Sequence, residues 1–384
     1  MEKLSDHKFI VYCGDNNNAL GICRSLGEKG IDPLVVLYTP KPYLLNHCKY
    51  VKNIYYVHSY EEGLDFIVNK WGNEPFKPFI YTMDEDTTIL LNQHYDELID
   101  KFYFFHCGEK DLVQFYMNKK NICDLAESCG IRKPKGELLK RGDLPTTLSY
   151  PVLTKVPIST MGAWKKDVFI CQNEDELRDA YKHIKSEELL VQEYIEKKNE
   201  LCIDGISLNG GEDIVLSYTS EYLRMGKQSF GNYMLMKLYE NEEMCAKIRN
   251  IIKQSHYTGI FDLECIITPD DELFFLEVNY RNSAWSYAHT FGGMNLLYYW
   301  AKWTIEGKSN YEECNIRKEP FTAMGEIADF SFVLHDPNTS LWTWYKQFRA
   351  CDCTYTYNSA DPKPFYFAIW HKVKTAFRHK VLHK

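Results

Sequence analysis

The sequence predicts a multidomain chain of mixed α/β and α+β class. Its 384 residues are enough for two or three compact domains. Over residues 1–115, short apolar runs alternate with helical patterns, as in a parallel sheet with crossover helices. Beyond about residue 130, strand patterns follow one another without strict alternation, which is typical of an α+β unit.

The first 115 residues are expected to form a Rossmann-like unit. The predicted elements are a strand at 9–12, a helix ending near Gly30, strands at 34–37 and 53–57, a helix at 61–71, a strand at 78–83 and a helix at 86–98. The turns at 16–18 and 84–86 follow strand ends, where open α/β sheets bind ligands. Both turns are equally typical of helix caps. The spacing of Gly14 and Gly21 is not GxGxxG, so support for a dinucleotide site is weak.

The second unit is expected to contain more strands than helices. The predicted elements are a helix at 119–130, strands at 136–139, 151–156 and 167–171, a helix at 174–184, strands at 189–193, 201–208 and 214–222, a helix at 240–254, and strands at 260–267 and 272–278.

Composition excludes several classes of function. The net charge of −8 argues against a general nucleic-acid binder, because such proteins need clustered Lys and Arg. A secretory leader and a bilayer-spanning apolar run of about 18 residues are both missing, so a cytoplasmic location is expected. The cysteines are scattered apart from Cys351 and Cys353, a spacing that fits neither a zinc site nor a redox CxxC. Buried free thiols are therefore predicted.

The most informative segment is the strand pair at 260–267 and 272–278. Side chains two residues apart share a strand face, so Asp262 and Glu264 point together, as do Glu277, Asn279 and Arg281. Carboxylates gathered in an apolar hairpin repel one another unless a cation lies between them. Such hard oxygen ligands suit Mg²⁺ that carries nucleotide phosphates. The alternative is a hairpin whose acidic face is exposed to water.

Several features upstream agree with this interpretation. Lys119 begins a helix, Lys155 ends an apolar strand, and a loop with Gly162 follows; residues 191–195 precede Glu200. With the hairpin, these features resemble the ATP-grasp superfamily over residues 115–305. Residues 277–281 look like its ExNxR signature, and residues 292–296 look like the segment that follows it. Residues 231–233, 257–259 and 277–296 are most similar to D-aspartate ligase and related bacterial carboxylate–amine ligases.

The resemblance implies a domain order and an activity. It implies a pre-ATP-grasp domain at 1–115, a small lobe at 116–190, a large lobe with the metal site at 191–310, and a C-terminal extension at 311–384. The expected cofactors are ATP and Mg²⁺. The expected activity is ligation: a carboxylate, such as that of aspartate, is activated as an acyl phosphate and transferred to an amine, with release of ADP and phosphate.

The resemblance also implies roles for individual residues. The metal ligands would be Glu264, Glu277 and Asn279, with Asp262 a weaker candidate, and Arg281 would hold the acyl phosphate. Arg224 and Lys227 are candidates for a substrate clamp. The expected nucleotide contacts are Lys119 and Lys155 on the phosphates, the loop with Gly162 over them, Gln192, Glu193, Tyr194 and Ile195 around the adenine, and Glu200 on the ribose.

Some alternatives stay open. The acceptor can instead be a thiol, ammonia or bicarbonate, although the chain has neither an AMKM segment nor a glutaminase module. A nucleotide-binding regulatory protein without turnover is a further alternative, but it would not need to keep Glu277, Asn279 and Arg281. Lone His289 is either a substrate contact or a core residue.

The last residues have apolar and basic side chains at helical spacing. Residues 365–384 therefore predict an amphipathic helix that either packs on the second domain or contacts an anionic membrane. Small molecules are the main expected partners, and a homodimer is the default oligomer.

Overall fold

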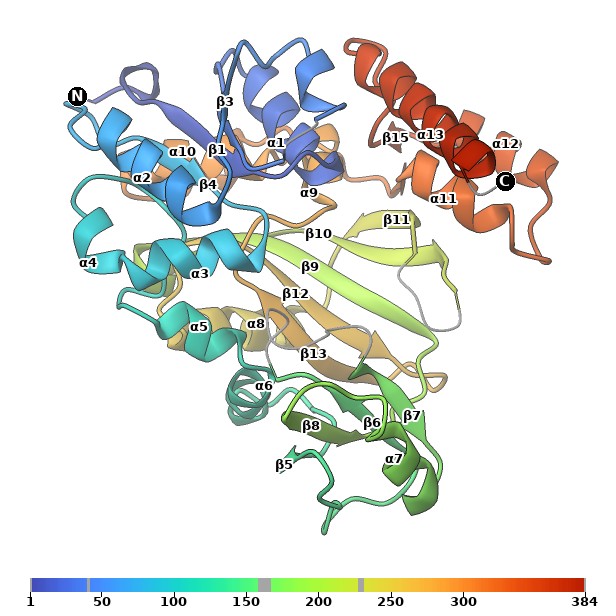
Figure 1. Cartoon of the computed structure of the whole chain (residues 1–384). Helices are drawn as coiled ribbons and strands as arrows, with labels where there is room; N and C mark the ends of the chain where they lie inside the picture. Colours follow the sequence, from blue (N-terminus) through green and yellow to red (C-terminus); the bar gives the residue numbers. More distant parts are fainter. Residues whose placement is uncertain (1, 40–41, 158–166, 227–230, 383–384) are drawn as a thin grey trace.

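Three β-sheets follow one another along the molecule in the computed structural model (Figure 1). The structure describes residues 2–39, 42–157, 167–226 and 231–382, with side chains as far as residue 375. Short 3-10 turns occur at Leu4–Asp6, Leu45–His47, Asn209–Gly211 and Tyr311–Glu313.

The first sheet is parallel and both of its faces are covered. Its strands, in spatial order, are β3 (Asn53–Tyr56), β2 (Leu34–Leu37), β1 (Phe9–Cys13) and β4 (Phe79–Tyr81). Its helices and those that follow it are α1 (Asn17–Gly27), α2 (Tyr60–Trp71), α3 (Glu85–Gln93), α4 (Tyr95–Leu98) and α5 (Leu112–Met117). Phe9 and Val11 pack into one core and Ile10 and Tyr12 into another, which explains why β1 is apolar at every position.

Two of the polar turns in this unit cap helices. The Asn16 side chain accepts a hydrogen bond from the Ala19 amide (3.1 Å) at the start of α1. The Asp84 carboxylate accepts one from the Thr87 amide (2.9 Å) at the start of α3. The interpretation of these turns as helix caps is confirmed.

The second sheet has seven strands and forms the centre of the molecule. In spatial order they are β13 (Leu273–Asn279), β12 (Gly259–Ile267), β9 (Asn199–Leu208), β10 (Asp213–Arg224), β11 (Tyr233–Leu238), β14 (Phe321–Met324) and β15 (Cys353–Thr354). The associated helices are α8 (Glu242–Gln254), α9 (Ser286–Phe291) and α10 (Leu296–Glu306). The sheet continues past residue 310, the predicted limit of the large lobe, because β14 pairs with the free edge of β11.

The central sheet shares its hydrophobic core with the parallel sheet. Trp300 and Trp303 of α10 are fully buried in a cluster that also contains Leu20 of α1, Phe79 of β4 and Ile203 of β9. The two sheets are therefore held together by continuous apolar packing.

The third sheet has a small core of its own. Its strands are β5 (Gly136–Lys140), β8 (Glu188–Glu193), β6 (Val152–Lys155) and β7 (Phe169–Cys171), and α7 (Glu174–Ala180) packs against them. The preceding helix α6 (Lys119–Ser128) packs on β13 of the central sheet. Val152, Leu177 and Leu189 are buried in a cluster separate from the main core. All thirteen cysteines are free, as predicted.

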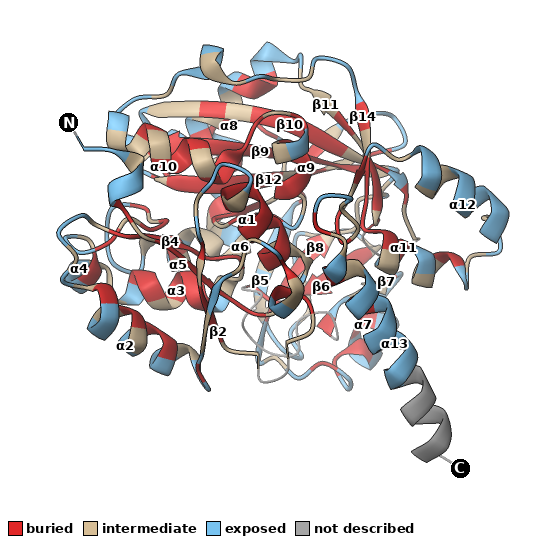
Figure 2. Ribbon diagram, turned by 90° about the horizontal axis from the view of Figure 1, so that it is seen from above, coloured by how far each residue is buried: buried red, intermediate tan, exposed pale blue. Residues whose placement is uncertain are grey.

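The C-terminal helices lie at one end of the molecule. They are α11 (Glu326–Val333), α12 (Leu341–Ala350) and α13 (Lys363–Leu382), and α13 projects from the body (Figure 2). The expectation that the apolar face of this last helix packs on the second domain is wrong, because Ile369, Trp370 and Val373 are 41%, 57% and 63% exposed. Among the described residues, none of the helices has the length and apolarity to traverse a bilayer.

A buried ion pair links the N-terminal helix α1 to the segment after β15. The fully buried Arg24 donates from Nε to Asp361 Oδ2 (3.0 Å) and from Nη1 to the Tyr355 carbonyl (2.8 Å). Asp361 also accepts from the Lys49 amide (3.0 Å). The pair fixes the segment on which Tyr355 lies.

We expect Asp361→Ala to lower the free energy of unfolding by about 3–5 kcal/mol, because it leaves the Arg24 charge buried and unpaired. The control is Lys52→Ala, which removes an exposed pair with Asp32 and should cost less than about 1 kcal/mol. Denaturant unfolding followed by tryptophan fluorescence measures both. Equal losses would contradict a structural role for the buried pair.

Candidate functional site

A cavity of about 830 Å³ lies between the small sheet and the central sheet. Residues of the parallel-sheet unit and of the C-terminal segment also line it. The structure brings together in its wall most of the residues that the sequence singled out, namely Lys119, Lys155, Gln192, Glu193, Tyr194, Ile195, Glu200, Asp262, Glu264, Glu277, Asn279 and Arg281.

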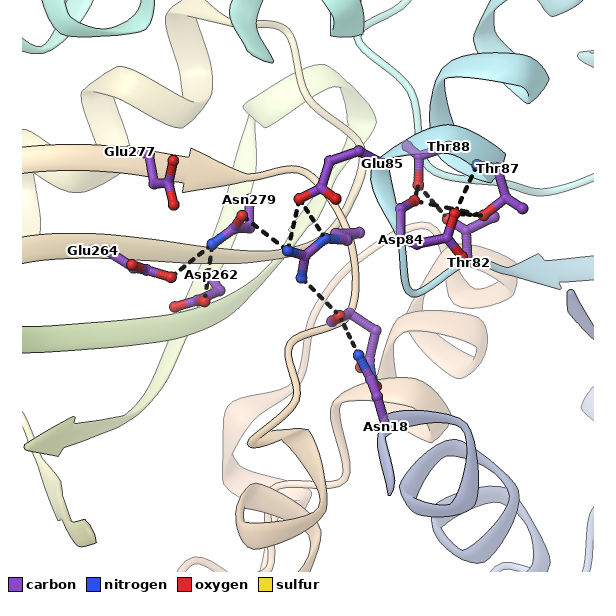
Figure 3. A network of polar contacts seen from close by, with 12 residues as sticks. Asn18, Thr82, Asp84, Glu85, Thr87, Thr88, Asp262, Glu264, Glu277 and Asn279 are labelled. Carbon is purple, nitrogen blue, oxygen red and sulfur yellow. Dashed lines mark hydrogen bonds and ion pairs between the residues drawn. The ribbon is translucent and has the colours of Figure 1, made fainter. Parts of the chain in front are cut away.

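Register in the β12–β13 hairpin sets the acidic side chains opposite one another. Asp262 pairs with Asn279 across the strands, and Glu264 pairs with Glu277. Asn279 Nδ2 donates to Glu264 Oε1 (2.8 Å) and to Asp262 Oδ2 (3.2 Å). Figure 3 shows these four side chains gathered on the two strands. Because Asp262 is buried and the others line the cavity, the alternative of a water-exposed acidic face is excluded.

The carboxylates disturb one another's protonation. Burial and the neighbouring Glu277 raise the pKa of Glu264 to about 8, and burial and Asp204 raise the pKa of Asp262 well above its usual range. Burial also raises the pKa of Glu277, but the ion pair with Lys119 outweighs burial and lowers it. The positive groups around the hairpin are therefore too few to keep all three carboxyl groups ionised, and Asp262 and Glu264 hold their protons more tightly than free carboxyl groups do.

The donor set fits a hard cation. Ligand atoms of Cys202, Asp262 and Glu264 lie within 4.8 Å of one another. Burial raises the pKa of the Cys202 thiol, so the thiol keeps its proton and only oxygen donors are left. Asp262 Oδ1 is buried and has no hydrogen-bond partner among the described residues. Oxygen donors of this kind suit Mg²⁺, and Asp262 lies closer to the centre of the group than the sequence indicated.

The Asn279 side chain is oriented differently from a metal ligand. Its nitrogen faces Asp262 and Glu264, and its oxygen accepts from Arg281 Nη2 (3.2 Å). In this conformation Asn279 links the two carboxylates to Arg281.

Two lysines face the hairpin from the small-sheet side. The Lys119 amide donates to the Pro157 carbonyl (2.8 Å), which fixes the start of α6 beside the end of β6. Burial and the nearby Lys119 lower the pKa of Lys155 to about 8. Two ammonium groups forced together in a buried site form a suitable environment for a phosphate anion.

The strand β8 and the residues after it form one part of the cavity wall. The Glu193 and Tyr194 amides already donate to the carbonyls of Lys135 (2.9 Å) and Pro151 (3.0 Å). The Ile195 amide has no hydrogen-bond partner among the described residues. Glu200 Oε1 accepts from Lys197 (2.7 Å), whereas its Oε2 is buried and unpaired within the described part of the chain.

Arg281 connects the hairpin to the parallel-sheet unit. Its Nε and Nη2 donate to Glu85 Oε1 (3.1 and 2.8 Å) at the start of α3, and Figure 3 shows Glu85 approaching the hairpin. Burial lowers the pKa of Arg281, but Glu85 outweighs burial and raises it, so the guanidinium stays charged. Its ion-pair partner is therefore Glu85 of the parallel-sheet unit and not a carboxylate of the hairpin.

Other predicted residues lie elsewhere. Arg224 is not part of the cavity wall, because it is buried in an ion pair with Asp329 of α11, and its proposed role as a substrate clamp is corrected. Gly162 and Lys227 lie outside the described residues. His289 is a core residue, bonded to Ser217 Oγ (2.7 Å) and 3.3 Å from Asp204.

Sequence reasoning gave no role to Trp285 and Tyr355, which also line the cavity, and only a weak one to the turns that hold Asn17 and Glu85. Asn17, Glu85 and Tyr355 lie outside residues 115–305, over which the resemblance extends, and Trp285 lies between the two motifs at 277–281 and 292–296. Helix-cap signals at residues 16 and 84 were the local pattern near Asn17 and Glu85.

Comparisons with known proteins agree with this geometry. The sequence is 21% identical over 340 residues to a D-aspartate ligase of Enterococcus faecium, covering 77% of this chain and 76% of the relative. No known family model matches the chain.

Solved structures show the same fold. An L-amino acid ligase from Bacillus licheniformis superposes with a TM-score of 0.62 at 14% identity, covering 82% of this chain and 79% of that one. The β-γ-ATP complex of biotin carboxylase from Campylobacter jejuni gives 0.65 at 15% identity, covering 83% and 76%. The resemblance to ATP-grasp ligases that the sequence predicts is confirmed.

We expect nucleotide binding to take up a proton above pH 8, because phosphate charge should restore the proton that Lys155 loses as pH rises through about 8. At pH 8.5 the uptake through Lys155 should be roughly three quarters of a proton, and at pH 6.5 near zero. Calorimetric titration with ATP in two buffers of different ionisation enthalpy measures it. Lys155→Arg, which stays charged, should lack this uptake; identical values for both proteins at pH 8.5 would contradict the assignment.

Proposed function

Because the chain has the ATP-grasp fold of these ligases, we propose that it is a Mg-ATP-dependent carboxylate–amine ligase. A carboxylate oxygen of the acid attacks the γ-phosphorus of ATP, ADP leaves, and an acyl phosphate forms. The amine nitrogen then attacks the acyl carbon, phosphate leaves, and the nitrogen loses a proton as the amide forms. The observation that carries this proposal is the convergence of three carboxylates, two lysines and Arg281 on one cavity.

The nucleotide would lie between the small and central sheets. The free Ile195 amide is available to an adenine ring, and the unpaired Glu200 Oε2 is available to the ribose hydroxyls. Lys119 and Lys155 would contact the phosphates. The loop with Gly162 keeps its predicted role as a phosphate cover.

Glu264, Glu277 and Asp262 would hold Mg²⁺, with Asn279 beside them. The ion would neutralise phosphate charge during transfer of the γ-phosphoryl group. Lys119 now neutralises Glu277, so it would have to exchange this partner for the nucleotide phosphates. The proposed ligand set differs from the sequence prediction in two ways: Asp262 becomes a ligand, and Asn279 becomes a neighbour that links the carboxyl groups to Arg281.

The acid and the amine would meet beside Arg281. Its guanidinium would hold the acyl phosphate and the oxyanion that forms when the amine attacks. Glu85 on the same wall complements an ammonium group, which favours an amino acid as one substrate. Similarity to a D-aspartate ligase makes aspartate the first acid to test.

We also propose a role for each domain of the chain. Residues 1–115 would act as the pre-ATP-grasp domain, because Asn17 and Glu85 reach the cavity from it. Residues 116–190 would form the small lobe, and the large lobe would extend from 191 past 310 to include β14 and β15.

We expect ADP and phosphate release from Mg-ATP only when a carboxylate and an amine are both supplied. A screen of amino acids, starting with D- and L-aspartate, against amines, ammonia, thiols and bicarbonate identifies the pair. Glu277→Gln should abolish release because it removes a metal ligand. The control Glu272→Gln, an exposed residue just before β13, should retain wild-type rates. Normal turnover by Glu277→Gln would refute the metal site.

We expect Arg281→Ala to lower kcat by about two to three powers of ten, as for loss of an oxyanion donor. Steady-state kinetics with the identified substrates measure the change. Arg132→Ala, which removes an exposed guanidinium outside the cavity, should leave kcat unchanged. A rise confined to KM would assign Arg281 to ground-state binding instead.

A further inference from the structure

Exposed large hydrophobic side chains concentrate in the C-terminal helices. In the described part of the chain, Tyr366, Trp370 and Val373 of α13 are 61%, 57% and 63% exposed, and Trp342 of α12 is 64% exposed. Both helices lie at the same end of the molecule (Figures 1 and 2). Contiguous apolar surface of this kind commonly marks an interaction site.

The exposed residues of α13 form one stripe. Tyr366, Ile369, Trp370 and Val373 are spaced i, i+3, i+4 and i+7, so they share a helix face. We call these four residues the α13 stripe. Residues 366, 367 and 369–375 are all exposed, and the α13 stripe gathers four of the apolar ones on one face.

The opposite face of α13 attaches the helix to the body. Ala368 is buried, the His371 ring stacks on Tyr43 at 4.3 Å, and Lys372 Nζ donates to Ser331 Oγ (2.9 Å). At about 100° per residue, these three positions lie on the side away from the α13 stripe. The helix is therefore held in place while its apolar stripe faces outward.

The charge of α13 is opposite in sign to that of the chain. The net charge of the whole protein is −8, whereas α13 contains no Asp or Glu. Lys374 Nζ lies 4.6 Å from the centre of the Trp370 ring. The basic residues of α13 are Lys363, Lys372, Lys374, Arg378 and Lys380.

We propose that α13 docks on an anionic lipid surface and lies in the plane of the interface. Apolar and aromatic side chains on one face, with a lysine such as Lys374 beside them, are the pattern of interfacial helices. Tryptophan and tyrosine rings place their apolar bodies among lipids and their polar atoms at the headgroups. A second copy of the chain fits less well, because a symmetric contact through this face would set two cationic helices against each other.

The test is co-sedimentation of the full-length protein with vesicles of phosphatidylglycerol and phosphatidylcholine, compared with phosphatidylcholine alone. We expect binding to the anionic vesicles at least about tenfold stronger than to the neutral ones. Trp370→Ser should weaken binding about tenfold through lost apolar burial. Lys374→Glu should weaken it about 25-fold, since each unit of charge contributes about fivefold.

Matched controls are Phe115→Ser and Lys110→Glu, which change an exposed aromatic and an exposed lysine outside α13 and should bind like the wild type. Absence of binding, or equal binding to both vesicle types, would overturn the proposal. So would a dimer in sedimentation velocity that Trp370→Ser dissociates while vesicle binding is absent. None of these measurements depends on ligase turnover, so this proposal and the proposed function fail separately.

Discussion

Mutual repulsion among closely spaced carboxyl groups is the constraint around which this molecule is organised. Asp262, Glu264 and Glu277 are brought together by the register of two adjacent strands; Asp262 is buried, and Glu264 and Glu277 are partly exposed in the cavity wall. Two neighbouring residues stabilise these carboxyl groups. Asn279 donates hydrogen bonds to Asp262 and Glu264, and Lys119 forms an ion pair with Glu277. A divalent cation would replace the protons that Asp262 and Glu264 hold and would supply the positive charge that the neighbouring residues lack.

Compensation of this charge requires parts of the chain that are remote in sequence. Lys119 comes from the start of α6 in the small-lobe region, and Arg281 is held by Glu85 from the parallel-sheet unit. The C-terminal segment adds Tyr355, which is fixed by the buried pair of Arg24 and Asp361. Residues from all three sheet units and from the C-terminal segment therefore line the cavity. The continuous core between the two larger sheets fixes the positions of its walls relative to one another.

The last helix, α13, differs from the rest of the fold because large apolar side chains on it are exposed. Its anchoring face is small, and Tyr366, Trp370 and Val373 of its apolar stripe are more than half exposed. A helix of this kind adds little to the stability of the fold, so its composition is better explained by contact with another surface. Its attachment beside residues 43–47 places that surface on the parallel-sheet unit, at a different site from the cavity wall.

The sequence by itself determined the local elements and the chemistry of the hairpin. Apolar periodicity located β1, β12 and β13, and alternation along a strand was enough to align Asp262 with Glu264 and Glu277 with Asn279. Only the tertiary structure decided which groups meet across long separations. Glu85 and Arg281 are 196 residues apart, and no local pattern encodes such a contact. The same limit applies to α13: an amphipathic pattern specifies a helix with an apolar face, but what lies against that face depends on packing that the pattern does not contain.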